Sequence, residues 1–222
     1  MSSNRRIGLF GGTFDPVHFG HLRTAIELGE LYSLNTLYLV PNHIPVHRDP
    51  ARASTDQRLA MLELAISDCE ALAVDSREAY RSRPSYSIDT LREIKTEHSG
   101  ATLIFFMGLD AFSQFDTWYQ WEDILEIANL VVVNRPDSAH SEFSGNLLLR
   151  QQASAGETIG SGVGAIEQCD VTQLAISATQ IRRRIAEKRS VRFLLPVAVS
   201  EYIVHEQLYL DIQSTATVSR QE

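Results

Sequence analysis

The chain has 222 residues, of which 44% are hydrophobic and 22% are charged. This length fits one α/β domain with a sizeable core, and this composition is that of an ordinary globular protein. The formal net charge of −8 argues against a general nucleic-acid binder.

No apolar run reaches the ~18 residues that a membrane span requires. The polar residues from Met1 to Arg6 lead straight into a strand and do not resemble a signal peptide. Cys69 and Cys169 are far apart and stand in no metal or redox motif. We therefore expect a cytoplasmic protein without a membrane or nucleic-acid partner. The sequence is compatible with either a monomer or a homo-oligomer.

The first stretch with a chemical pattern lies near the N-terminus. Ile7 to Phe10 is predicted to be a buried strand and about Pro16 to Leu31 a helix, with Gly11-Gly12-Thr13 as the turn between them. We expect Asp15 to cap the helix and Pro16 to occupy its first position. Glycines in such a turn let the backbone approach a phosphate, and the N–H groups of the first helical turn point at the anion.

Two histidines follow the turn. His18 and His21 are three residues apart and share one face of the predicted helix, while Gly20 leaves room for a nucleotide. Imidazoles in this place can donate hydrogen bonds to a polyphosphate and to charge that develops when it is cleaved. A zinc pair or a satisfied surface histidine is the alternative, but no cysteine lies nearby to complete a metal site.

The stretch from Gly11 to His21, which ends in Val-His-Phe-Gly-His, resembles the signature of the nucleotidyltransferase superfamily with a His-x-Gly-His motif. Members of this superfamily transfer a nucleoside monophosphate from a triphosphate to a phosphate or an alcohol. The resemblance implies a catalytic role for His18 and His21. It also implies that ATP contacts the residues of the turn, which are Gly11, Gly12, Thr13, Phe14, His18, Gly20 and His21.

Further buried strands alternate with helices, which predicts a Rossmann-like, doubly wound parallel sheet. We expect one domain over residues 1–210 with a small C-terminal helical portion, and a polar tail over 211–222. Ser54 or Thr55 caps a helix through Ile66, whose Arg58 is most simply solvated, and a final helix runs to about Leu208. Residues 137–164 form a polar excursion with one helix near 146–153. The strands are expected at Thr36–Val40, Leu72–Val74, Thr102–Met107, Leu130–Asn134 and Ile166–Val171.

Several loops at the predicted strand ends are similar to those of nicotinate-nucleotide adenylyltransferases. The loop from Pro41 to Arg48 resembles their Pro-Pro-His-Lys loop, although Val46 replaces the second proline and Arg48 the lysine. By itself, this loop is equally well a plain connector. The resemblance implies that His47 and Arg48 contact the nicotinate nucleotide and that Arg48 acts in catalysis.

Two aromatic segments resemble the pyridine-binding turns of the same family. Ser85-Tyr86-Ser87 resembles its Pro-Ser-Tyr-Thr segment, with Ser87 in place of threonine, and Thr117-Trp118-Tyr119 resembles a turn where a tryptophan ring stacks on nicotinate. The first segment is otherwise a capped helix start. The aromatic cluster is otherwise core, as we expect for Trp121.

Two further strand ends carry residues that the resemblance assigns to the site. Gly108 and Asp110 follow the strand at Thr102–Met107, where the family places its nucleotide substrates, although Asp110 is also suited to cap the next helix. Arg135 closes the strand at Leu130–Asn134, and the family places such an Arg-Pro pair near the active-site cleft.

Near the C-terminus, Ile176 to Arg182 predicts a helix start with hydroxyls at its cap and a cation one turn later. N–H groups, a hydroxyl and a guanidinium together make a second anion site. An amphipathic helix with a solvated basic face is the alternative. The stretch resembles the Ile-Ser-Ser-Thr-x-Ile-Arg motif that closes over the triphosphate, which implies ATP contacts from Ile176, Ser177, Thr179 and Arg182, with Arg182 also catalytic.

Together these motifs resemble bacterial-type nicotinate-nucleotide adenylyltransferases. The resemblance implies adenylyl transfer from ATP, carrying Mg²⁺, to nicotinate mononucleotide, giving deamido-NAD and pyrophosphate. No residue is expected to hold a metal by itself. Another adenylyltransferase of the same fold, such as one acting on phosphopantetheine, and a non-catalytic nucleotide sensor are the alternatives. The implied contacts of the nicotinate nucleotide are Thr13, His47, Arg48, Ser85, Tyr86, Ser87, Asp110, Trp118, Tyr119 and Arg135.

Overall fold

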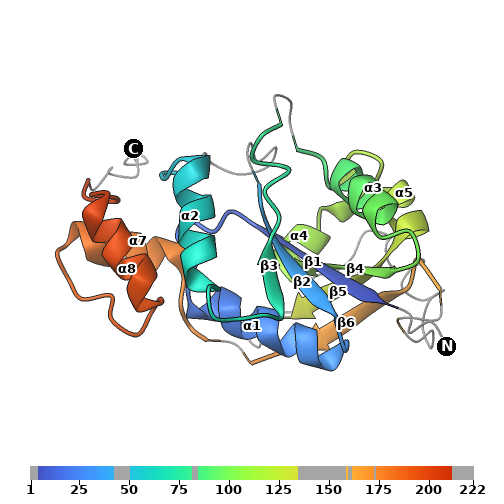
Figure 1. The fold of residues 1–222 in the computed structure, drawn as a ribbon, viewed down its shortest axis with the longest axis horizontal. Helices are drawn as coiled ribbons and strands as arrows, with labels where there is room; N and C mark the ends of the chain where they lie inside the picture. Colours follow the sequence, from blue (N-terminus) through green and yellow to red (C-terminus); the bar gives the residue numbers. More distant parts are fainter. Residues whose placement is uncertain are drawn as a thin grey trace, which may run out of the picture.

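Six parallel strands form one sheet in the order β3-β2-β1-β4-β5-β6 (Figure 1). The computed structural model describes residues 5–42, 51–81, 85–134, 159, 162–172 and 174–211. The order reverses between β1 and β4, as in a doubly wound sheet, which confirms the predicted fold class. The strands are β1 (Arg6–Gly12), β2 (Thr36–Pro41), β3 (Leu72–Val74), β4 (Thr102–Gly108), β5 (Ala128–Asn134) and β6 (Ile166–Asp170).

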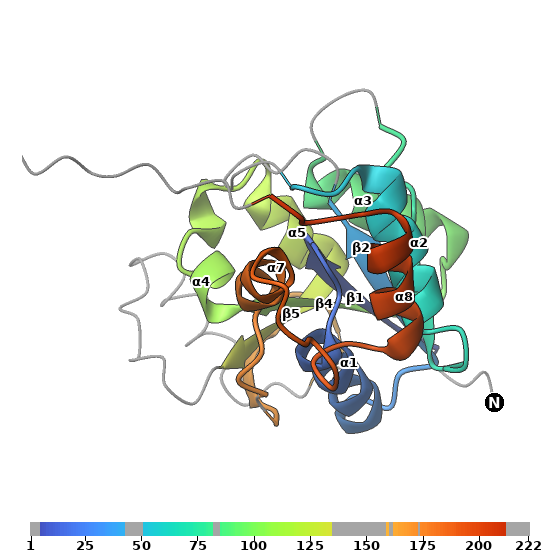
Figure 2. The ribbon, with the colours of Figure 1, turned by 90° about the vertical axis from the view of Figure 1, so that its left-hand side faces the viewer.

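Helices cover both faces of this sheet, and two of them lie beyond its end. Figure 1 shows α7 and α8 at the left, away from the strands, and Figure 2, viewed from that side, shows α7 in front of the sheet. The helices are α1 (Phe19–Leu31), α2 (Thr55–Ala65), α3 (Ser87–Glu97), α4 (Leu109–Phe112), α5 (Trp121–Ile127), α7 (Ala178–Ala186) and α8 (Val197–His205), with a 3₁₀ turn η1 (Phe115–Thr117).

The core divides into two halves because successive side chains of a strand point to opposite faces. In β4, Ile104 and Phe106 belong to the cluster under α1 and α2, whereas Leu103 and Phe105 belong to the cluster under α3 and α5. Buried residues of α7 and α8 join the first cluster. Every residue of β4 before Gly108 is buried, as its unbroken apolar sequence predicts.

The start of α1 differs from the prediction. The strand β1 continues to Gly12, and the helix begins at Phe19 with His18 as its N-cap, so Asp15 does not cap it and Pro16 is not its first residue. The reason is that the Asp15 carboxylate accepts the backbone N–H groups of Arg52 and Ala53 instead, at 2.8 and 3.1 Å. Residues 13–18 therefore form a longer connection than expected.

The prediction that Arg58 is solvated is wrong. Its side chain is 1% exposed and donates from Nη1 to the Thr13 carbonyl at 2.8 Å and from Nη2 to the Thr55 hydroxyl at 3.2 Å. The capping of α2 by Ser54 is confirmed, because its hydroxyl accepts the Gln57 N–H. The final helix ends at His205, earlier than expected, because left-handed residues follow at Gln207 and Tyr209.

Some predictions fall outside the described residues. They concern the loop that carries His47 and Arg48, the residue Arg135, and the helix expected near 146–153. Within the described part of the chain, no helix is both long and apolar enough to cross a membrane.

Candidate active site

The two histidines of the N-terminal stretch lie against each other at the start of α1. Their rings stack with centroids 3.8 Å apart, and the edge of Phe14 packs on His21 at 5.1 Å. Phe14 is buried and takes a left-handed conformation, with φ of 48°, which turns the chain after β1. The backbone thus holds both imidazoles together beyond the carboxyl end of a central strand, where ligands bind in open α/β sheets.

Burial sets the charge of the first histidine. His18 is 4% exposed, and removal from water lowers its pKa from 6.5 to about 4. Its imidazole is therefore neutral at pH 7 and carries one N–H for donation. Among the described residues, His18 Nδ1 has no hydrogen-bond partner, which leaves this buried polar atom for a ligand or for water.

The missing side chain of Gly20 makes room for the segment at Ile176, which precedes α7. A Cβ atom on Gly20 would lie 3.0 Å from two atoms of the His18 ring and 3.6 Å from the carbonyl oxygen of Ile176. The glycine therefore lets the histidine pair and the segment before α7 approach each other. Residues 18–21 and residue 176 lie side by side although the sequence separates them widely.

Arg182 of α7 joins the same place. Its Nη1 donates to the Asp15 carbonyl at 2.6 Å, and its Nη2 donates to the Thr179 hydroxyl at 3.1 Å. Ser177 is the N-cap of α7, and its hydroxyl accepts the Gln180 N–H at 3.2 Å. The structure thus brings the C-terminal motif onto the connection after β1, as the phosphate hypothesis requires, with the guanidinium held by protein groups.

The first turn of α1 offers fewer free backbone N–H groups to an anion than expected. The Phe19 N–H donates to the Leu194 carbonyl at 3.1 Å, and the N–H groups of His21 and Leu22 donate to the His18 carbonyl. Three N–H groups at this helix start therefore have partners within the protein. The side chains and the preceding glycines, rather than this helix terminus, are the groups best suited to an anion. Around Gly11 there is open space, whereas the Gly12 Cα faces the ring of Phe14.

The two aromatic segments meet. The rings of Tyr86 and Tyr119 lie 4.7 Å apart, and Ser87 is the first residue of α3, directly after Tyr86. Trp118 ends η1 and packs edge-on against Phe115 at 5.7 Å. The Tyr86–Tyr119 contact joins two segments that lie about thirty positions apart in the chain, as expected if both segments hold one ring-shaped substrate.

The remaining members of these segments have structural partners or lie at a strand end. The Ser85 hydroxyl donates to the Glu78 carbonyl, and Trp121 packs on Phe115 in the core, as expected. Gly108 ends β4 and is the N-cap of α4, so Asp110 is not the cap. Asp110 is exposed in the first turn of α4, one strand away from the turn after β1.

Sequence reasoning missed two residues of the site, Arg58 and Tyr209. Tyr209 is 8% exposed, and its hydroxyl donates to Asp15 Oδ1 at 2.7 Å, although 194 positions separate the two residues. No local pattern predicts that contact. For Arg58 a signal existed, since it shares a helix face with the buried Met61 and Leu62.

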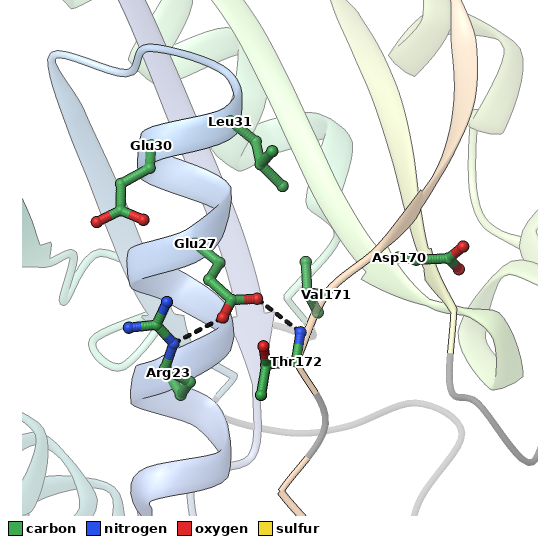
Figure 3. A pocket seen from close by; sticks show the side chains of 7 residues that line it. All are labelled: Arg23, Glu27, Glu30, Leu31, Asp170, Val171 and Thr172. Carbon is green, nitrogen blue, oxygen red and sulfur yellow. Dashed lines mark hydrogen bonds and ion pairs between the residues drawn. The ribbon is translucent and has the colours of Figure 1, made fainter.

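A separate groove of about 500 Å³ runs between α1 and the end of β6 (Figure 3). Glu27 in this groove accepts the Thr172 N–H at 2.6 Å and pairs with Arg23 at 2.7 Å. Glu30 and Asp170 add two more carboxylates to its lining. Because the groove is acidic, it does not suit a phosphate, and the predicted site residues lie elsewhere.

Comparisons with known proteins agree with the motifs. Residues 9–184 match the model of the family described as cytidylyltransferase-like. The chain is 45% identical over 208 residues to a probable nicotinate-nucleotide adenylyltransferase of Pseudomonas paraeruginosa, covering 92% of this chain and 97% of that protein. It is 43% identical to a protein of the same name from Cellvibrio japonicus, covering 91% and 98%.

A solved structure supports the fold. Nicotinic acid mononucleotide adenylyltransferase of Plasmodium falciparum, complexed with NaAD, aligns with a TM-score of 0.71 at 16% identity, covering 93% of this chain and 98% of that chain. With the family model, the two curated relatives and the geometry of the histidine turn in agreement, the chain belongs to the cytidylyltransferase-like family and, within it, to the nicotinate-nucleotide adenylyltransferases.

Proposed function

We propose that this chain transfers the adenylyl group of ATP to the phosphate of nicotinate mononucleotide, giving deamido-NAD and pyrophosphate. The observation that carries the proposal is the meeting of two distant motifs beyond β1. Arg182 of α7 donates to the Asp15 carbonyl, on the connection that leads into the stacked pair of His18 and His21. Relatives at 43–45% identity bear the name of this activity.

The reaction needs alignment and charge neutralisation more than a protein nucleophile. A phosphate oxygen of nicotinate mononucleotide attacks the α-phosphorus of ATP, a new P–O bond forms, and the bond to the β-phosphate breaks with release of pyrophosphate. The attacking phosphate has a second pKa near ~6 and is already ionised at neutral pH. Holding the two substrates in line therefore supplies much of the rate enhancement.

His18, His21 and Arg182 are suited to the charge that leaves with pyrophosphate. A neutral His18 donates one hydrogen bond without the cost of a buried cation, and an approaching phosphate favours its protonation. Arg182 adds a guanidinium, whose planar set of donors matches phosphate oxygens. We assign the same task to Arg48, whose place in the loop after β2 rests on the resemblance alone.

We propose that Mg²⁺ enters with ATP. The described groups around the turn are imidazoles and guanidiniums, which suit phosphate oxygens rather than a hard cation. Asp15, the nearest carboxylate, already accepts two backbone N–H groups and a hydroxyl. Mg²⁺ is commonly held by substrate phosphates, where it neutralises part of their charge. We place the reaction in the cytoplasm, in keeping with two free cysteines, Cys69 and Cys169.

The contact between Tyr86 and Tyr119, the residue after Trp118, supports nicotinate as the ring. Its carboxylate accepts hydrogen bonds only, and the backbone N–H groups at the start of α3 and at Tyr119 are suited to such a group, whereas those of Thr117 and Trp118 already donate to the Gln114 and Phe115 carbonyls. The amide of nicotinamide instead brings an NH₂ group against those donors. Each such mismatch costs about 1–3 kcal/mol, so two of them predict a preference of about 100-fold or more.

The test measures pyrophosphate release with ATP and three acceptors: nicotinate mononucleotide, nicotinamide mononucleotide and phosphopantetheine. We expect the highest kcat/KM with nicotinate mononucleotide. Equal values for the two pyridine nucleotides would refute the pocket while leaving adenylyl transfer intact. A higher kcat/KM with phosphopantetheine would mean that the chain is an adenylyltransferase with that acceptor instead. ATP binding without turnover on any acceptor would favour a nucleotide sensor.

A further inference from the structure

A buried network joins the end of the described chain to the connection after β1. Asp15 lies at its centre, with a side chain that is 5% exposed. Its Oδ1 accepts the Tyr209 hydroxyl at 2.7 Å and the Ala53 N–H at 3.1 Å, and its Oδ2 accepts the Arg52 N–H at 2.8 Å. A buried carboxylate with three such donors is fixed in one orientation.

The same residue holds Arg182 by two atoms. Arg182 Nη1 lies 2.6 Å from the Asp15 carbonyl oxygen and 3.7 Å from Asp15 Oδ2. Because the carboxylate cannot turn without breaking its other bonds, the position of the guanidinium depends on those bonds. Among the described residues, Arg182 Nε is buried without a hydrogen-bond partner. A donor therefore remains for a ligand at the connection between β1 and α1, where Arg182 contacts Asp15.

Arg58 of α2 also contacts the connection after β1, close to Asp15. Its guanidinium donates to the Thr13 carbonyl, two residues before Asp15, and electrostatic attraction from Asp15 opposes the lowering of its pKa by burial. The Asp15 carboxylate therefore attracts two guanidiniums, that of Arg182 at 3.7 Å and that of Arg58 at longer range. Burial and the nearby Asp15 charge raise the pKa of Tyr209, so its hydroxyl stays protonated as a donor across the neutral range. The cluster keeps one excess positive charge beside the proposed phosphate site.

We infer that Tyr209 is a positioning residue for the nucleotidyl-transfer reaction: its hydroxyl fixes the Asp15 carboxylate, and Asp15 in turn holds Arg182 where the triphosphate of ATP binds. The inference rests on the proposed role of Arg182. The last turn before residue 211 is thereby part of the ATP side of the active site.

The test uses Tyr209→Phe in the full chain, which removes only the hydroxyl. Tyr202→Phe in α8 is the matched control, because it is the same change in a partly buried core tyrosine of the same segment. Binding of a non-hydrolysable α,β-methylene analogue of ATP is measured by calorimetry, together with KM for each substrate and the melting temperature. We expect Tyr209→Phe to weaken analogue binding about ten-fold, the typical effect of a lost hydrogen bond to a charged group. We expect KM for nicotinate mononucleotide to change less than two-fold.

A double-mutant cycle separates positioning from general stability. If Tyr209 acts through Arg182, the Tyr209→Phe loss should shrink to less than two-fold in an Arg182→Ala background. The same ten-fold loss in both backgrounds, unchanged analogue binding in Tyr209→Phe, or an equal loss in Tyr202→Phe would overturn the inference. If Arg182→Ala alone leaves analogue binding unchanged, the proposed site fails instead. Asp15→Asn is a weaker test because it also removes the negative charge near the buried guanidinium of Arg58.

Discussion

Replacing Gly20 with alanine tests whether the His18 ring must lie where the structure places it. The new Cβ would lie 3.0 Å from His18 Cε1 and Nδ1, whereas ordinary van der Waals contacts begin at 3.4 Å. The ring must therefore move by at least a few tenths of an ångström. Since it stacks on His21 at 3.8 Å, that imidazole is displaced as well. A misplacement of about 1 Å costs roughly 100-fold in rate, so we expect kcat/KM to fall about 10- to 100-fold.

Gly29→Ala is the matched control in the same helix. A Cβ atom there meets nothing within 4 Å, so this variant should keep full activity and gain about 0.5–1 kcal/mol of stability. The assay is steady-state pyrophosphate release with both substrates, accompanied by thermal unfolding to show that each variant is folded. If Gly20→Ala turns over at the wild-type rate, the ring position does not matter for catalysis and the reasoning fails.

Three further predictions concern the charges and rings of the site. Arg182→Ala should raise KM for ATP or lower kcat by about ten-fold or more, while Arg183→Ala, whose side chain is 68% exposed, should keep wild-type kinetics; equal losses would mean a merely basic helix surface. Between pH 6.5 and about 4, the unfolded state binds more protons at His18 than the folded state does. The free energy of unfolding therefore decreases as the pH is lowered through this range. His18→Gln should remove about 2 kcal/mol of the loss seen in urea unfolding between pH 7.5 and 5; the same loss in the variant and the wild type would contradict this account of His18. Trp118→Ala should raise KM for nicotinate mononucleotide about five-fold by loss of stacking and leave KM for ATP unchanged; an equal rise in both would indicate general loss of packing.

Local sequence signals predicted the sheet and the elements that carry the motifs. The apolar run of β4 and the serine at the start of α7 are found as expected, because burial on both faces and helix capping depend on neighbouring residues. The bounds of α1 were wrong for the opposite reason. Asp15 has the sequence pattern of a cap, but tertiary partners at Arg52 and Ala53 compete for its carboxylate.

The missed residues depend on contacts that no local pattern contains. Tyr209 reaches Asp15 only after the chain has folded around α2 and α8, and a lone tyrosine near the C-terminus carries no signal of that contact. Arg58 was judged by its charge rather than by its place on an apolar helix face. The resemblance, in contrast, assigned both Tyr86 and Tyr119 to the nicotinate-nucleotide site, and the structure brings their rings within 4.7 Å of each other.

The central place of β1 also affects how the chain is made. The strand pairs on one side with β2, which follows soon after it, and on the other with β4, whose residues come only after α2, β3 and α3. Until β4 docks, the N–H and C=O groups along one edge of an apolar strand stay unpaired, and such an edge can pair with another chain. A newly synthesised or refolding molecule therefore exposes its most functionally important strand to aggregation. Its refolding yield is expected to fall as the protein concentration rises.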